Sequence, residues 1–453
     1  MDSKEKQFIK MTETPVNKLV ITLAVPATVG MLITTIYNMA DTYFVSKLGT
    51  SASGAVGIVF SLMAILQAFA FMYGQGAGCI IAAKLGAGET ESASQTATLA
   101  LFSAIATGLF ILVFGNIFIN PFMKLLGSTD TILPYARTYA RCILCAAPFM
   151  MSSNVLNNIL RYEGMARDSM TGMLAGGILN IILDPCLIFI AGLGVLGAGF
   201  ATAVSQLVSF SLLLSVFLKG RTQSKLGVTH YKWDFKLFST ICATGLPSLI
   251  RQGMQSISGM VLNTYAGLMG GDAAIAAMSI VGRVTFFCFA VGLGVGQGYQ
   301  PVAGFNYGAK KYKRVKDASL FTWMIAQVCI SVMAIIGLIF AERLVTFFRN
   351  DPDVIIIGAK ALRYQLIALL TIPLHVTSNM SLQSTGHHKG ASVLSFLKSG
   401  LFFIPIIFIL SNTIGLLGVQ IAQPIADVFT TIASIPFYIW FIRKLDRLEA
   451  NKN

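Results

Sequence analysis

Long apolar runs recur from one end of this 453-residue sequence to the other, about one every 35–40 residues. Each run is close to the ~20 residues that an α-helix needs to cross the hydrocarbon core of a bilayer. Only 11% of the residues are charged, whereas a soluble protein averages about 25%. No stretch of about ten residues alternates between apolar and polar side chains, as the strands of a membrane barrel do. The sequence therefore predicts an all-α polytopic membrane protein.

Polar breaks divide the apolar runs into twelve predicted transmembrane helices. With an even number of spans both termini share one side of the membrane, and that side carries most of the 33 Lys and Arg. The positive-inside rule then predicts a protein of the cytoplasmic (plasma) membrane with cytoplasmic N- and C-termini. The net charge of +14 is thus a topology signal and not a nucleic-acid footprint. The expected helices are 18–46, 54–83, 94–119, 134–160, 169–192, 197–219, 236–268, 275–305, 317–341, 357–384, 391–412 and 418–442.

The second half of the sequence repeats the first at a spacing of about 221 residues. Pro26 is answered by Pro247, and "GVLGAGFATAV" (194–204) is answered by "GLLGVQIAQPI" (415–425). Six-helix repeats of the same orientation are related by an axis along the membrane normal, as in known transporters. We therefore expect two pseudo-symmetric six-helix lobes around a central cavity: an N-lobe over 1–219, a cytoplasmic linker over 220–236 and a C-lobe over 237–453.

Spaced glycines in "GLGVGQG" (292–298) imitate the phosphate-binding fingerprint of dinucleotide-binding proteins. That motif needs a strand before it and a helix after it, whereas these glycines lie inside a predicted membrane helix. Glycine lets a second helix approach closely, so we expect a helix crossing here. No nucleotide-binding segment is present, which excludes ATP-driven transport by this chain alone.

Two carboxylates lie inside the predicted spans of the first half, Asp41 and Asp184. A charge at the bilayer centre costs about 2.5–3.5 kcal/mol, which makes each one a functional hypothesis. Asn180 and Asp184 are one helical turn apart on the same face, Pro185 frees a backbone carbonyl four residues earlier, and Thr202 could add a hydroxyl. Oxygen ligands of this kind suit a hard cation such as Na⁺, and the same carboxylates could instead take up a proton.

The repeat confines these carboxylates to the first half, because Asn263 matches Asp41 and Ile404 matches Asp184. The predicted ion site therefore belongs to the N-lobe. Such a site, loaded on one side of the membrane and emptied on the other, would couple ion flow to transport.

The second half carries a different set of intramembrane charges: Arg251, Arg283, Lys398 and Asp427. One interpretation is internal neutralisation, with Asp427 paired to a base. The alternative is that Arg251 or Lys398 faces the cavity and handles anionic parts of a substrate. His375 is expected to be a hydrogen-bonded structural residue, and the loop residues His387 and His388 are expected to be solvated.

The stretches "VPATVGMLITTIYNMADTYFVSKLG" and "LNIILDPCLIFIAGLGVLGAGFATAVS" resemble the multidrug and toxic compound extrusion (MATE) transporters of bacteria and archaea. The resemblance covers nearly the whole chain. It implies a transporter, not an enzyme, that exports bulky, often cationic aromatic compounds in exchange for H⁺ or Na⁺ by rocking alternating access. It assigns cation coupling to Asp41, Asn180, Asp184 and Thr202, a bend of the first helix to Pro26, and substrate-cavity positions to Tyr37, Tyr139, Asn154 and Asn157.

Met173 is a further cavity candidate, since flexible methionine side chains suit varied apolar ligands. The chain departs from some members of the family in its second half, where Gln252, Gln255 and Asn379 stand in place of acidic residues. A second-lobe ion site is therefore not expected.

Two other functions compete with a secondary antiporter. A lipid-linked precursor flippase would carry extra helices and a strongly cationic cavity, and here twelve spans hold only three intramembrane bases. A channel or sensor would not need paired halves with carboxylates in one of them. We expect a monomer in the lipid bilayer that binds small organic substrates, has no nucleic-acid partner and uses no cofactor besides the coupling ion.

Overall fold

The computed structural model describes residues 3–452, and every regular element within that range is helical. Ten of these helices are long and apolar enough to cross a membrane, and a pair bent by 50° makes an eleventh span. The longest of the ten, α9 (Phe235–Gly308), consists of two helices that meet at Gly271, where the backbone turns to φ 62° and ψ −158°. Counting its two parts separately gives twelve spans, which confirms the predicted all-α polytopic fold.

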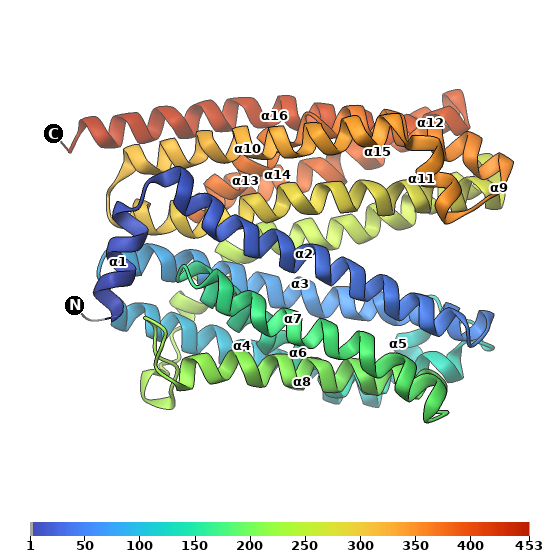
Figure 1. The fold of residues 1–453 in the computed structure, drawn as a ribbon, viewed down its shortest axis with the longest axis horizontal. Coiled ribbons are helices and arrows are strands. Elements are labelled where there is room, and N and C mark those ends of the chain that lie inside the picture. Colours follow the sequence, from blue (N-terminus) through green and yellow to red (C-terminus); the bar gives the residue numbers. More distant parts are fainter. Residues whose placement is uncertain (1–2, 453) are drawn as a thin grey trace. The chain divides into compact units, whose positions relative to one another are not determined.

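The spanning helices of the first half follow the predicted ranges to within a few residues (Figure 1). Pro185 ends one of them, and the chain continues as a π-helix, η1 (Cys186–Ile190). A π-turn of this kind is often found at a functional site. The helices are α2 (Val16–Ser46), α3 (Thr50–Gly86), α4 (Thr90–Ile117), α6 (Leu133–Tyr162), α7 (Ala166–Pro185) and α8 (Gly194–Leu218).

The second half repeats this order after α9. The bent span breaks before Pro373, which lacks the N–H that would continue the preceding helix. Another span contains a π-helix, η3 (Leu397–Phe402), that includes Lys398. The elements are α10 (Tyr312–Ile339), α12 (Pro352–Leu369), α13 (Ile372–Ser384), α14 (His388–Phe396), η3, α15 (Phe403–Ile414) and α16 (Leu416–Ala450).

Three short helices lie outside the predicted ranges: α1 (Ser3–Glu13), α5 (Ile119–Leu125) and α11 (Ala341–Phe348). α1 packs through Met11, which is fully buried, and the Gln7 side chain donates to the carbonyl oxygen of Glu163 at 2.8 Å. These helices are too short to cross a bilayer, so they do not change the number of spans. A 3-10 turn, η2 (Val228–His230), lies in the linker between the halves.

The repeat is visible in the backbone as well as in the sequence. Gly164 and Gly386 close equivalent turns with φ values of 81° and 83°, and Gly88 and Lys310 do the same with 82° and 57°. Positive φ is rare for residues other than glycine, so its recurrence at the repeat spacing indicates that both halves are built on one plan.

The chain forms two compact units whose borders do not coincide with the two halves. Unit 1 comprises the described residues up to Glu13 and Val29–Leu249, and unit 2 comprises Thr14–Thr28 and Ile250–Asn453. The chain thus changes unit after Glu13, after Thr28 and after Leu249, and the last two positions are one repeat apart. Each half contributes the beginning of its first helix to the unit formed mainly by the other half. The predicted lobes 1–219 and 237–453 follow the repeat instead, and stay a prediction.

The beginning of the first helix of each half, which belongs to the unit formed mainly by the other half, packs there against a second helix through glycines. In unit 1, a Cβ atom on Gly76 would lie 2.2 Å from the carbonyl oxygen of Ile241, and one on Gly245 would lie 1.8 Å from the carbonyl oxygen of Met72. Both distances are far below van der Waals contact, so α3 and the start of α9 approach closer than any side chain would permit.

The same crossing recurs in unit 2, between the start of α2 and the second part of α9. A Cβ atom on Gly294 would lie 2.5 Å from Cα of Thr28, and one on Gly298 would lie 2.3 Å from Cα of Ala24. Gly294 and Gly298 belong to the stretch that imitates a dinucleotide fingerprint. The prediction that these glycines serve close helix packing is confirmed.

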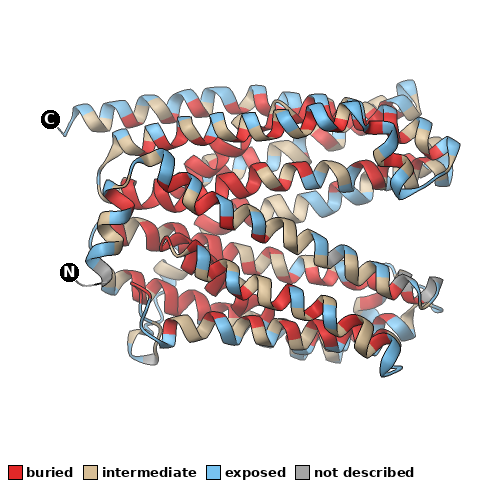
Figure 2. Ribbon diagram, viewed as in Figure 1, coloured by how far each residue is buried: buried red, intermediate tan, exposed pale blue. Residues whose placement is uncertain are grey.

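One helix forms the core of unit 1. In α6, 83% of the spanning segment is buried, against 28–50% for α3, α4, α7 and α8, all of which contact it (Figure 2). In unit 2 the corresponding position is taken by α13, in which nearly every residue is buried. Most side chains on these two helices are therefore enclosed by protein rather than by lipid.

Candidate functional site

Two groups of polar side chains meet inside unit 1. On one side, the Tyr139 hydroxyl of α6 donates to Oδ2 of Asp41 on α2 at 3.0 Å. On the other side, the Asn180 amide of α7 lies 3.4 Å from both Oδ1 of Asp184 and Oγ1 of Thr202 on α8. Tyr139 interacts electrostatically with both Asp41 and Asp184. The two carboxylates also interact electrostatically with each other. The structure therefore brings the four residues predicted for cation coupling into one neighbourhood, with Tyr139 between them.

The cluster is enclosed and holds oxygens that nothing in the described part of the chain satisfies. Asp184 is fully buried, and Asn180, Thr202 and Tyr139 are each less than 5% exposed. Oδ1 of Asp41, Oδ1 of Asn180 and Oδ2 of Asp184 have no hydrogen-bond partner among residues 3–452. A buried polar oxygen without a partner costs about 1–3 kcal/mol, and a charged one costs more. These three oxygens are therefore placed to accept a proton or a cation.

Local sequence explains why these helices approach so closely. A Cβ atom on Gly176 of α7 would lie 3.2 Å from the backbone oxygen of Ser205 on α8, and one on Gly199 would lie 2.8 Å from the ring of Tyr139. The absence of side chains at these two positions lets α8 pack against both α7 and α6. No group of three His, Cys, Asp or Glu side chains in residues 3–452 is arranged to bind a metal ion. A Na⁺ ion would therefore depend on Asn180 and Thr202 as well as on the two carboxylates.

All the predicted cavity residues belong to unit 1, and of them Tyr37 lies one turn before Asp41 on α2. Tyr37 packs on α7 opposite Gly177, and Met173 packs against Gly30 of α2. Asn154 accepts a hydrogen bond of 2.8 Å from Asn158, one turn further along α6.

Asn157 has a structural partner. Its amide donates to the backbone oxygen of Ser169 at 2.8 Å and joins α6 to the start of α7. A role for these residues in substrate binding stays a prediction.

Comparisons with known proteins identify the family. The sequence model of the MatE family matches residues 26–186 and 247–409, which together exceed half of the chain. This chain belongs to the MatE family. The multidrug export protein MepA of Staphylococcus aureus (strain MSSA476) is 28% identical over 449 residues, covering 99% of this chain and 98% of that protein. MepA of Staphylococcus haemolyticus (strain JCSC1435) is 26% identical with the same coverage.

The solved structures agree with this assignment. An outward-facing multidrug resistance MATE family transporter of the MOP superfamily superposes with a TM-score of 0.91 at 27% identity, covering 98% of each chain. The MatE protein is therefore a multi-pass membrane transporter of the multidrug efflux type, and not an enzyme.

Pro26 lies in the part of α2 that belongs to unit 2, whereas Asp41 lies further along the same helix in unit 1. The chain changes unit two residues after Pro26. A proline inside a helix removes one backbone hydrogen bond and weakens the helix at that point. Pro26 is thus placed next to the point where α2 leaves one unit for the other.

The charges of the second half gather around a cavity of about 200 Å³ in unit 2. Arg251, Lys398 and Asp427 all line it. Lys398 lies 3.7 Å from Oδ1 of Asp427, so a base and this carboxylate do pair, as one interpretation expects. Because Arg251 and Lys398 also face a cavity, the geometry supports the alternative interpretation too. Arg283 is exposed and lies apart from this lining.

His375, also on the lining, accepts or donates one hydrogen bond of 2.9 Å with Ser434 and is 6% exposed. It is the hydrogen-bonded structural histidine that the sequence predicts.

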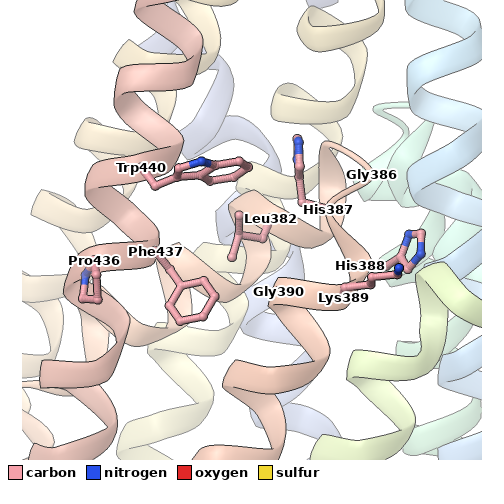
Figure 3. Close-up of a pocket in the computed structure, with 9 residues that line it drawn as sticks. All are labelled: Leu382, Gly386, His387, His388, Lys389, Gly390, Pro436, Phe437 and Trp440. Atoms are coloured by element: carbon pink, nitrogen blue, oxygen red, sulfur yellow. The ribbon is translucent and has the colours of Figure 1, made fainter.

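A larger cavity of about 570 Å³ lies between α16 and the turn before α14 (Figure 3). Trp440 of α16 extends toward His387, and Phe437 of the same helix lines the cavity further down. The expectation that His387 is solvated is wrong: its ring is half-buried, stacks edge-on with Trp440 at 5.2 Å, and contacts Nζ of Lys444 at 2.6 Å. The α16 side chains that cover this turn are about 50 residues away in the sequence, which is why the loop looks exposed from its own composition.

Glu163, a fully buried carboxylate at the end of α6, is not among the residues that the sequence singles out. It accepts hydrogen bonds from the backbone N–H of Gln223 at 2.7 Å and of Ser224 at 3.1 Å, and from the Ser224 hydroxyl. Glu163 thereby fixes the linker that follows α8. An acidic residue after a predicted span was the only available signal, and its partners lie 60 residues further along the chain.

Proposed function

We propose that this MatE transporter is an antiporter that exchanges H⁺ or Na⁺ for bulky, often cationic aromatic compounds. The observation that supports this most directly is the cluster of buried oxygens around Asp41 and Asp184 in unit 1. Two carboxylates enclosed together disfavour the doubly ionised, empty state, because desolvation and mutual repulsion add. The cluster is therefore most stable when it holds a positive charge.

Coupling follows if ion and substrate compete for this negative charge. A cationic compound that enters beside Asp41 neutralises it and releases the bound ion, and an incoming ion displaces the compound. Inward movement of one positive charge releases about 2.3 kcal/mol for each 100 mV of membrane potential. That energy is enough to export a compound against a modest concentration ratio.

The direction of transport depends on the orientation of the chain. We propose cytoplasmic termini, on the basis of the excess of Lys and Arg on that side. Rocking between inward- and outward-open states would expose the cluster to each side in turn, and bending of α2 at Pro26 would link occupation of Asp41 to the shape of the site. The transporter acts as a monomer in this scheme, since one chain carries both halves of the repeat.

The test is efflux of ethidium from proteoliposomes, with a pH gradient and a Na⁺ gradient imposed separately. We expect one of the two gradients to drive efflux in the wild type, and Asp41→Asn and Asp184→Asn each to abolish that response. Asp130→Asn is the matched control, because this carboxylate is 86% exposed in a loop.

Full coupled efflux in Asp41→Asn would remove Asp41 from the mechanism. If neither gradient drives efflux through folded wild-type protein, the antiport proposal fails.

A further inference from the structure

The cavity in unit 2 differs in charge from the cluster in unit 1. Its lining contains two bases, Arg251 and Lys398, and a single carboxylate, Asp427. The ionisable side chains of the lining thus include more bases than carboxylates, at a cavity between membrane-spanning helices. Charged side chains at such a place are a functional hypothesis by default.

Asp427 is largely satisfied without Lys398. The Gln365 amide donates to its Oδ2 at 2.7 Å, and the Gln423 amide donates to its Oδ1 at 3.0 Å. Nζ of Lys398 lies 3.7 Å from Oδ1 of Asp427. This distance is longer than the about 2.7–2.9 Å of a charge-assisted hydrogen bond. The ammonium group therefore attracts Asp427 electrostatically but does not donate a hydrogen bond to it.

Lys398 is held in place by its other neighbours. Its ammonium lies 4.4 Å from the ring centre of Phe289, a cation–π contact, and its backbone forms part of the π-helix η3. The wider turn of a π-helix is frequently found at functional sites. Lys398 is thus a positioned cation at the cavity wall.

The rest of the lining suits an aromatic ligand. Phe286, Met278 and Leu293 supply apolar surface, and the hydroxyl oxygen of Thr285 is buried there without a hydrogen-bond partner in the part of the chain that the structure describes. The volume of about 200 Å³ is below the about 300–1,000 Å³ of pockets for drug-sized ligands, so it favours a small ring system.

We infer that this cavity binds the carboxylate of an amphipathic aromatic anion, with Lys398 and Arg251 as its cationic partners. The transporter then has two sites of opposite polarity: carboxylates in unit 1 for cations, and bases in unit 2 for the anionic group of a substrate. Aromatic carboxylates and zwitterions become export substrates beside organic cations. This extension rests on the proposed export function for transport, but not for binding.

Binding is measured by equilibrium dialysis of the purified full-length protein with three probes that share one ring system. These are 2-naphthoate, the neutral 2-naphthamide and the cationic 2-naphthylmethylammonium. We expect 2-naphthoate to bind about tenfold more tightly than 2-naphthamide, the difference that one charge-assisted hydrogen bond supplies.

Lys398→Gln is expected to remove this preference and Lys398→Arg to keep it. Arg283→Gln is the matched control, since it deletes a base of the same half that does not line the cavity. Equal binding of 2-naphthoate and 2-naphthamide, or an unchanged preference in Lys398→Gln, would overturn the inference. Thermal unfolding shows whether each variant is folded. If Lys398→Gln does not fold, Lys398→Arg is the variant with which the role of the charge is tested.

Ethidium efflux separates this inference from the proposed function. Lys398→Gln should retain gradient-driven ethidium efflux while losing efflux of 2-naphthoate. If wild-type protein binds 2-naphthoate with the expected preference but exports neither compound, the antiport proposal fails and the binding site stands. If ethidium is exported and 2-naphthoate is not bound, the antiport proposal stands and the anion site does not exist.

Discussion

At the scale of single residues, the Tyr139 hydroxyl is the hydrogen-bond donor to Asp41 in unit 1. It donates to one oxygen of Asp41 and leaves the other oxygen of that carboxylate without a partner. A hydrogen bond to a charged group contributes about 1.5–3 kcal/mol. Tyr139 therefore stabilises Asp41 in its ionised state, the state that must exist each time the ion leaves.

Tyr139→Phe is expected to slow ion release and lower the rate of gradient-driven ethidium efflux at least several-fold, because ionised Asp41 loses its donor. The ring and its contact with Gly199 remain, so folding should be unaffected. Initial efflux rates in proteoliposomes measure the effect. Tyr73→Phe, which removes a hydroxyl hydrogen bond to Thr107 in the same unit, is the control. An unchanged rate in Tyr139→Phe would show that Asp41 does not need this donor.

His387, outside the spans, has a pH-dependent role. Burial, assisted by the nearby Lys444 and His388, lowers its pKa to about 4 from an ordinary value near 6.5. The folded state thus favours the neutral ring, and its stabilising contribution is complete above about pH 6.5 and is lost as the pH falls toward 4.

His387→Gln should remove this part of the pH dependence. Thermal unfolding in detergent near pH 7.5 and near pH 5 is the measurement, and the wild type should lose more of its unfolding temperature between them than the variant does. Tyr73→Phe, which leaves every histidine in place, should behave like the wild type. Parallel losses in wild type and His387→Gln would contradict the assignment.

At the scale of elements, the glycine crossings set how the helices pack. A side chain at Gly298 would meet the backbone of Ala24, which cannot move aside as a flexible side chain could. Overpacking of this kind costs about 1–3 kcal/mol or more. The equivalent crossing at Gly76 obeys the same constraint.

Gly298→Ala is therefore expected to lower the unfolding temperature and the yield of folded protein, although alanine is otherwise the better helix former. Gly253→Ala, at a glycine where an added Cβ atom would meet nothing within 4 Å, should be neutral or slightly stabilising, by up to about 1 kcal/mol. Fluorescence-detected thermal unfolding compares the two. Equal stability would mean that the helices separate at this crossing without cost.

The spanning helices could be predicted because each one had to bury about 20 apolar residues, and the repeat then tied the two halves together. The short helices α1, α5 and α11 could not, since packing against other elements and not hydropathy decides them. At the candidate site, the cost of polar residues in a membrane pointed to Asp41, Asn180, Asp184 and Thr202. The partner of Asp41 could not be read in the same way, because Tyr139 lies 98 residues away.

At the scale of the whole molecule, the linker is not the boundary between the two units. It ends before α9, and the first part of α9 up to Leu249 still belongs to unit 1. The chain changes unit at three points: between α1 and α2 after Glu13, and inside helices after Thr28 and after Leu249. A cut in the linker therefore separates the two halves of the sequence repeat, but each fragment still contains part of both packed units.

We expect protein cleaved at an engineered protease site over 231–233, where the side chains are exposed, to stay in one piece. Both fragments should elute together from size-exclusion chromatography in mild detergent, because each carries a segment that completes the unit of the other. Uncleaved protein with the same insertion is the control. Separation of the fragments would show that the exchanged segments contribute little to cohesion.

The exchange of first-helix segments also constrains how such a chain could have arisen. A six-helix ancestor would have had an arm that fits only into a second copy, so it would have worked as an arm-exchanged homodimer with identical subunits. Joining the two copies in one polypeptide frees each of them from having to match the other. In this chain one copy holds carboxylates and the other holds bases within the spans, a difference that a dimer of identical subunits cannot have.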